Sequence, residues 1–192
     1  MEIVVAVTGA SGSIYGLRLL EKLHGREGVT VHLVLSRSGE RTAWLETGKV
    51  SADFRALAAV VHPVEDVGAS IASGSFLTDA MVIAPCSIHT MSAIAHGISS
   101  NLITRAADVI LKERRKLILM VRETPLHLGH LRTMTQLAEM GAIIAPPVPG
   151  FYNKPQTVLD IVDHSVDRVL DLLGLPDQGA HRWQGGGGAK QS

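Results

Sequence analysis

The sequence contains a single cysteine, Cys86, among its 192 residues. One thiol cannot form an internal disulfide, so a disulfide framework is excluded and a reducing compartment is expected. Charge of one sign is not in excess, because 18 basic residues balance 18 acidic ones, and this balance gives no reason to expect nucleic-acid binding. Apolar runs are too short for a membrane span, and the apolar N-terminal stretch is interrupted early by glycine and serine, which argues against a signal peptide. We therefore expect a soluble, cytoplasmic protein with no nucleic-acid or membrane partner.

The composition predicts a folded chain with a large core. Hydrophobic residues make up 46% of the sequence and charged residues 19%, which excludes general disorder and favours a buried sheet or an oligomer. The length suits one domain. We predict a single α/β domain over residues 1–175 and a C-terminal tail over 176–192, of which the glycine-rich part, 184–192, should be disordered.

Short apolar runs alternate with segments of helical periodicity. The runs lie at residues 2–7, 29–35, 60–61, 80–84, 116–121 and 142–145. Helical patterns lie at 14–23, 39–47, 52–59, 88–97, 127–140 and 155–174, and one more runs through residues 105 and 112. The helix at 155–174 is amphipathic, and we expect its buried side to consist of Val158, Ile161, Val162, Ser165, Val169 and Leu172. This alternation predicts a doubly wound parallel sheet with helices on both faces and ligands at the carboxyl ends of the strands.

The first strand ends at the turn Thr8-Gly9-Ala10-Ser11-Gly12, and a helical pattern begins directly after it. Glycines allow a ligand to approach the backbone closely, and the first amides of a helix attract anions, so a bound phosphate is one interpretation. A simple tight turn is an equally good one. The glycine spacing differs from the dinucleotide fingerprint G-x-G-x-x-G, which disfavours NAD.

Further polar residues follow other predicted strands. Small hydroxyls and one guanidinium suit a phosphorylated, heteroaromatic ligand, and they are Ser11, Ser36, Ser87, Thr90 and Arg122. A second group would concentrate cations around a carboxylate if it converged, and it consists of Arg105, Lys112, Glu123, Tyr152 and Arg168. The plainer alternative is that these cations lie on solvated helix faces, and that Arg122 and Glu123 form a weak surface pair.

Two candidate chemistries are disfavoured by the pattern. Cys86 follows an apolar strand and a proline, which favours a small buried thiol over a nucleophile. His127 and His130 lie three residues apart, and His89 and His96 seven apart, but no carboxylate or cysteine joins either pair at the spacing of metal ligands. No metal site is predicted.

Several separate motifs together resemble one family. The motifs are Thr8-Gly-Ala-Ser-Gly12, Pro85-Cys-Ser87, Asn101-Leu-Ile-x-Arg105-Ala-Ala-Asp108, Leu111-Lys-Glu-Arg114, Arg122-Glu-x-Pro125 and Pro149-Gly-Phe-Tyr-Asn-x-Pro155. In their order and spacing the sequence is similar to the UbiX-type flavin prenyltransferases, from about residue 2 to Trp183. The resemblance implies a flavin-binding domain of flavodoxin-like or Rossmann-like fold in a homo-oligomer, typically a dodecamer. It implies a metal-independent transferase that joins a dimethylallyl group from dimethylallyl phosphate to N5 of reduced FMN, closes a ring at C6, and supplies prenylated FMN to a UbiD-type decarboxylase.

The resemblance also implies residue roles. FMN would be held by Gly9, Ala10, Ser11, Ser36, Ser87, Ile88, His89, Thr90 and Arg122. The prenyl phosphate would be bound by Tyr152, Arg168, Arg105 and Lys112, the last two across a subunit boundary. Glu123 would relay protons to the departing phosphate, Ser11 with Glu46 would assist ring closure, Lys112 would stabilise the developing anion, and Trp183 in the tail would form a wall of the pocket.

The sequence departs from the family at two positions, and two other functions stay open. His89 stands where lysine or glycine is common, and Val121 where proline is common; neither is in the implied catalytic group. One alternative is a flavin-dependent cysteine decarboxylase, whose Pro-Ala-Ser-Ala-Asn-type motif is absent and which would leave Arg105, Lys112 and Glu123 unexplained. The other is a non-catalytic FMN-binding accessory subunit.

Overall fold

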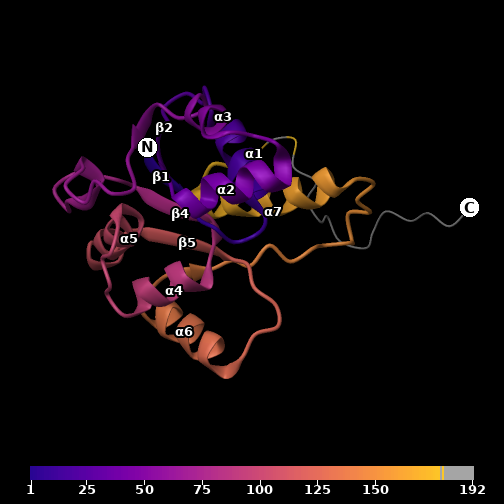
Figure 1. The fold of residues 1–192 in the computed structure, drawn as a ribbon. Helices are drawn as coiled ribbons and strands as arrows, with labels where there is room; N and C mark the ends of the chain where they lie inside the picture. The colour runs from indigo at the N-terminus through magenta and orange to yellow at the C-terminus, as the bar shows by residue number, and fades with distance from the viewer. Residues whose placement is uncertain (178, 180–192) are drawn as a thin grey trace, which may run out of the picture.

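The structure is a computed structural model that describes residues 1–177 and 179. Its centre is a six-stranded sheet in the order β3-β2-β1-β4-β5-β6. Strands β1, β2, β4 and β5 are labelled in Figure 1. All neighbouring strands pair in parallel. The strands are β1 (Glu2–Val7), β2 (Thr30–Leu35), β3 (Val60–His62), β4 (Ala80–Cys86), β5 (Lys116–Val121) and β6 (Ile143–Ile144).

Helices cover both faces of this sheet (Figure 1). In chain order they are α1 (Ser13–Leu23), α2 (Arg37–Thr47), α3 (Ser51–Arg55), α4 (Ile88–Ala95), α5 (Leu102–Lys112), α6 (Leu128–Glu139) and α7 (Val158–Leu173), with a short 3-10 helix at Ser70–Ala72. The predicted doubly wound, flavodoxin-like or Rossmann-like sheet is confirmed, and its strand order is the one found in dinucleotide-binding Rossmann domains.

The alternation of side chains along β1 explains the two layers. Ile3, Val5 and Val7 pack into one core with α1 and α7. Val4 and Ala6 point to the opposite face and pack with α4 and α5. Because both faces of β1 are covered, the strand is apolar at every position from Ile3 onward, as expected for a central parallel strand.

The expected buried side of α7 is wrong at its first residue. Val162, Ser165 and Val169 are buried, but Val158 is 78% exposed. Val158 fits the apolar periodicity of the helix, but the first turn of α7 extends beyond the core. Its side chain therefore lines a surface cavity instead of packing in the core.

The strand order places a topological switch point between β1 and β4. The chain moves from β1 outward to β2 and β3, then crosses to β4 on the other side of β1. The loops after β1 and β4 therefore leave the sheet in opposite directions and open a crevice at its carboxyl edge, where doubly wound folds bind ligands. No helix among the described residues has the length and apolarity needed to cross a membrane.

Candidate functional site

The buried hydroxyl of Thr8 joins the two loops at the switch point. Thr8 Oγ1 donates to the backbone oxygen of Pro85 at 2.7 Å and accepts from the Ser87 N–H at 2.9 Å. Thr8 is 2% exposed, so this crosslink is shielded from water. It fixes the turn after β1 against the start of α4.

Two further helices begin at the same edge, each with a serine cap. Ser36 Oγ accepts from the Gly39 N–H at 3.0 Å at the start of α2. Ser87 Oγ accepts from the Thr90 N–H at 3.2 Å at the start of α4 and donates to Thr90 Oγ1 at 3.0 Å. Helix starts present amides and the positive end of the helix dipole, so both are suited to an anionic group.

The glycine turn lies close to α2. A Cβ on Gly9 would lie 2.5 Å from Ser38 Cβ, which is closer than side chains can approach, so only glycine allows this contact. Thr42 Oγ1 of α2 donates to the Gly9 carbonyl at 3.3 Å. Ala10 is half-buried and Ser11 exposed in the same turn, which therefore stands between the starts of α1 and α2.

The start of α1 is occupied by a carboxylate of the chain itself. Glu46 accepts hydrogen bonds from the Gly12 N–H at 2.9 Å, from the Ser13 N–H at 3.0 Å and from Ser13 Oγ at 2.8 Å. The phosphate that the glycine turn suggests is therefore not needed at these amides. The anion at this helix start is a carboxylate of α2 from the same chain.

These contacts change the acidity of Glu46. Partial burial alone would raise its pKa, but hydrogen bonds from Ser11, Ser13 and Gly12 outweigh that effect and lower the pKa below its ordinary value of 4.5. Glu46 is therefore ionised at neutral pH, poised beside the Ser11 hydroxyl.

We expect Glu46→Gln to remove a pH-dependent part of the stability. A lowered pKa in the folded state contributes stability that is complete above pH 4.5 and is lost as the pH falls through the folded-state pKa. The difference in melting temperature between wild type and variant should therefore be largest at neutral pH, equivalent to about 1 kcal/mol for a helix cap, and should shrink below pH 4.5. A difference that stays constant from pH 7 to pH 3 would contradict this account.

A cavity of about 620 Å³ opens beside Ser11 and Glu46. Its polar lining includes Arg122, which follows β5 and whose Nε donates to the Ser11 carbonyl at 3.1 Å. The other walls are mainly apolar, and they consist of Ile14, Tyr15, Pro147, Val158 and Val162, with Gly12 and Thr47 at the edge. A planar, largely apolar ligand with a polar rim fits such walls.

Several of these wall residues are missed by sequence reasoning. Ile14 appears there only as the first residue of the helical pattern at 14–23, and Val158 is placed on the buried side of the last helix, while Tyr15 and Pro147 receive no role. Tyr15 is partly buried, and this burial raises its pKa, so its hydroxyl is protonated at neutral pH. Its place one turn after the glycine loop is the one signal that could have identified it.

The other residues expected to hold a flavin lie at the same edge with different exposure. Ile88 is half-buried and packs against the core, His89 is exposed and Thr90 is 7% exposed. Burial raises the pKa of the Cys86 thiol to about 12, so this cysteine is a protonated core residue, as its sequence context indicates. The described residues contain no group of three or more metal-ligating side chains.

The expected cation group does not converge within one chain. Lys112 ends α5 four residues before β5 begins, and it pairs with Glu113 beside Gly74, which lies ahead of β4. Lys112 is therefore at the amino edge of the sheet, opposite the cavity. Arg105 pairs with Asp108 at 2.9 Å, and Arg168 pairs with Asp171 at 2.8 Å.

Glu123 and Tyr152 lie on exposed loops near the carboxyl edge. Glu123 directly follows Arg122, and its carboxylate accepts from the Thr124 N–H at 2.9 Å. Tyr152 is 51% exposed, and its hydroxyl lies 2.6 Å from Nε2 of His164 on α7. Trp183 and the tail from 184 to 192 lie outside the described residues.

Comparison with known proteins places the chain in a family. The family model described as Flavoprotein matches residues 1–170. A flavin prenyltransferase UbiX of Thauera aromatica is 56% identical over 185 residues, covering 96% of this chain and 95% of the relative. A crystal structure from Escherichia coli O157:H7, described as a dodecameric FMN-dependent UbiX-like decarboxylase, superposes with a TM-score of 0.95 at 48% identity, covering 96% of this chain and 100% of that one.

A second crystal structure is informative about ligands. AnUbiX (PadA1), solved in complex with FMN and dimethylallyl pyrophosphate, has a TM-score of 0.93 at 47% identity, covering 96% of this chain and 97% of that one. In contrast, an FMN-dependent cysteine decarboxylase of thioviridamide biosynthesis is 18% identical with a TM-score of 0.61, covering 86% of this chain and 98% of that one, a likeness of fold alone. The chain belongs to the UbiX family of flavin prenyltransferases.

Proposed function

We propose that the protein joins a dimethylallyl group to reduced FMN and thereby makes prenylated FMN. The observation that carries the proposal is the largely apolar cavity at the carboxyl edge of the sheet, which Ser11, Glu46 and Arg122 line. The similarity to AnUbiX, whose structure contains FMN and dimethylallyl pyrophosphate, supports FMN and a phosphorylated dimethylallyl donor as the ligands here. We treat residues 1–175 as one flavin-binding domain and expect the protein to act in the cytoplasm.

The chain offers a suitable setting for FMN. The apolar walls fit a flavin ring, the starts of α2 and α4 offer amides to its phosphate, and Arg122 lies beside the Ser11 carbonyl at the rim. Reduced FMN supplies the nucleophilic atoms N5 and C6 when it is bound. We assign its binding to Gly9, Ala10, Ser11, Ser36, Ser87, Ile88, His89, Thr90 and Arg122.

The prenyl phosphate needs positive charge as it leaves. We assign this role to Tyr152 and Arg168 of one chain together with Arg105 and Lys112 of a neighbouring copy. The position of Lys112 at the opposite edge of the sheet supports a contribution from a second copy. Cations that bind the departing phosphate more tightly than the bound ester lower the barrier.

Two carboxylates would handle protons. Glu123 would donate a proton to the departing phosphate, because a protonated phosphate is the better leaving group. Glu46, ionised and hydrogen-bonded to Ser11, would support proton movement through that hydroxyl during ring closure. Trp183 would cover the pocket and help exclude water from a reactive allyl cation.

The proposal includes a homo-oligomer, a dodecamer by analogy with the Escherichia coli relative. Exposed apolar side chains on and after α2 support self-association: Trp44 is 58%, Leu45 64% and Val50 50% exposed. The product would pass to a UbiD-type decarboxylase.

The mass of the flavin tests this function. We expect anaerobic incubation of the protein with reduced FMN and dimethylallyl phosphate to add one five-carbon prenyl unit to the flavin. Dimethylallyl diphosphate in a parallel reaction identifies the preferred donor. An unchanged flavin with decarboxylation of a thiol peptide would support a cysteine decarboxylase instead, and an absence of chemistry with tight FMN binding would support an accessory subunit.

A further inference from the structure

The side chain of His164 contacts the hydroxyl of Tyr152 directly. Tyr152 Oη lies 2.6 Å from His164 Nε2, and the two rings meet edge to face with centroids 5.3 Å apart and planes at 80°. Gly150 makes room for this arrangement, because a Cβ there would lie 3.0 Å from His164 Cε1. Ring packing and a hydrogen bond together hold the Tyr152 side chain against α7.

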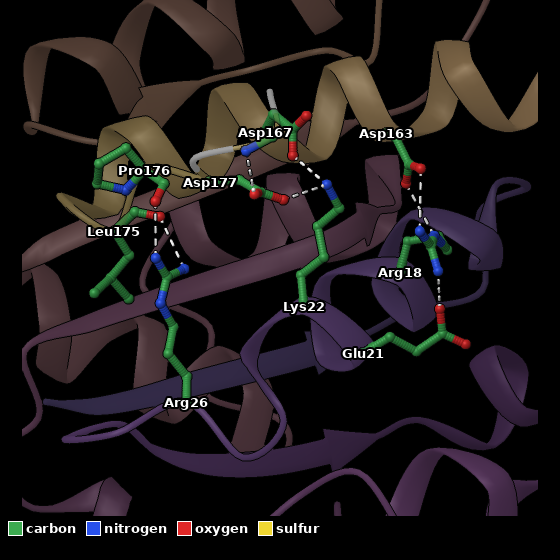
Figure 2. Close-up of polar contacts among 10 residues, drawn as sticks. Arg18, Glu21, Lys22, Arg26, Asp163, Asp167, Leu175, Pro176 and Asp177 are labelled. Atoms are coloured by element: carbon green, nitrogen blue, oxygen red, sulfur yellow. Dashed lines mark hydrogen bonds and ion pairs between the residues drawn. The ribbon is translucent and has the colours of Figure 1, made fainter. Parts of the chain in front are cut away.

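The helix that carries His164 is firmly attached to the domain. Asp163 of α7 accepts from Arg18 Nε of α1 at 2.9 Å, and Asp167 pairs with Lys22 (Figure 2). Arg26 donates to the carbonyls of Leu175 at 3.0 Å and Pro176 at 2.8 Å just after α7 (Figure 2). The contacts to Asp163, Asp167 and Leu175 are partly buried, and only the one to Pro176 is exposed, so the helix is a rigid support for a residue on an exposed loop.

His164 also lies on the same side of α7 as Arg168. The two residues are four apart, which places them one turn apart on a helix. Both line a small cavity of about 90 Å³ together with Val148 and Ser165. The imidazole therefore brings the Tyr152 hydroxyl to the helix face that carries the guanidinium assigned to the prenyl phosphate.

The direction of the hydrogen bond determines what the hydroxyl can do. A phenol has one proton to donate. If Nε2 carries no hydrogen, that proton is directed to His164. If Nε2 carries one, the imidazole donates to Oη and the hydroxyl proton is left for a phosphate oxygen.

We propose that His164 is a positioning residue, which holds Tyr152 through Nε2 and directs its hydroxyl proton to the phosphate of the prenyl donor. This inference rests on the proposed function, in which Tyr152 binds that phosphate. Holding the exposed tyrosine in place before the donor arrives lowers the entropic cost of binding. His164 itself does not touch the donor.

Paired variants test the proposal. His164→Phe keeps an aromatic ring against Tyr152 but cannot form the hydrogen bond, whereas His164→Gln keeps a side-chain amide of similar reach. With FMN saturating, His164→Phe should raise KM for dimethylallyl phosphate by about three- to tenfold, the range for one lost hydrogen bond. Its kcat and FMN affinity should stay within twofold of wild type, and His164→Gln should recover most of the KM.

A double-mutant cycle separates positioning from general damage. In a Tyr152→Phe background, His164→Phe should have no further effect on KM. The proposal is overturned if His164→Phe raises KM equally with and without the tyrosine hydroxyl. It is also overturned if the His164→Phe single variant has an unchanged KM. If Tyr152→Phe alone leaves KM unchanged, Tyr152 does not bind the phosphate, and the positioning role of His164 is overturned with it. The proposed function itself is overturned only if the wild-type protein makes no prenylated flavin.

Discussion

Replacing Glu123 with glutamine is expected to lower the rate of prenyl transfer by about 100- to 10,000-fold, the contribution typical of general acid catalysis. Glutamine keeps the size of the side chain and an oxygen that can accept from the Thr124 N–H, as the carboxylate does at 2.9 Å. It cannot deliver a proton to the departing phosphate. Because FMN binding is assigned to other residues, FMN affinity should stay near that of wild type. Single-turnover formation of prenylated FMN measures the rate, and flavin fluorescence measures the affinity.

Controls for Glu123→Gln come from elsewhere in the chain. Glu139 is exposed at the end of α6, so Glu139→Gln should leave the rate unchanged. Lys112→Ala should also be nearly inactive, and co-expression of the Glu123→Gln and Lys112→Ala chains should restore part of the activity if each site combines residues of two copies. A Glu123→Gln protein with the wild-type rate would remove Glu123 from the mechanism.

Gly16→Ala is expected to destabilise the protein by about 3 kcal/mol, at the upper end of the usual cost of overpacking a core. Gly16 lies on the buried face of α1. A Cβ there would lie 2.3 Å from the backbone oxygen of Ala84 and 2.9 Å from Val7 Cγ2, so α1 would have to move away from the sheet. Urea unfolding of the purified protein measures the loss.

Gly68→Ala is the matched control for that substitution. Gly68 lies in an exposed loop, and the nearest atom to a Cβ there would be Asp66 Oδ1 at 3.5 Å, an ordinary contact. This variant should unfold within about 0.5 kcal/mol of wild type, as surface substitutions usually do. Equal unfolding midpoints for Gly16→Ala and Gly68→Ala would contradict the close packing of α1 on β4.

Local patterns predicted the elements well because strand and helix periodicity depend on neighbours in sequence. The central strand β1 was identified by its unbroken apolar run, since residues buried on both faces cannot be polar. The helices expected at 88–97 and 155–174 lie at Ile88–Ala95 and Val158–Leu173, where Ser87 caps the start of the first and Gly174 the end of the second. The exception, Val158, shows the limit of this reasoning, because periodicity does not reveal where the core ends.

Contacts between distant residues could not be predicted in the same way. Glu46 and Gly12 lie 34 positions apart, and no local pattern indicates that the carboxylate would reach the start of α1. The pairing of Tyr152 with His164 depends on how the loop before α7 folds back on the helix. Motif order suggested which residues serve the site, but it could not indicate that Lys112 lies at the opposite edge from Arg122.

The sequence by itself therefore determined the α/β class, the positions of the strands and the motifs that resemble a flavin prenyltransferase, because each of these depends on residue type and spacing. The resemblance implied that Ser11 acts with Glu46, but only the tertiary structure decided that Glu46 binds the amides at the start of α1 and that Arg122 contacts the Ser11 carbonyl. Arg122 contacts Ser11 because β1 and β5 end at the same edge of a parallel sheet, and Glu46 contacts Ser11 because the end of α2 lies beside the start of α1. Distances of this kind depend on packing across the whole domain, which no local stretch of sequence encodes.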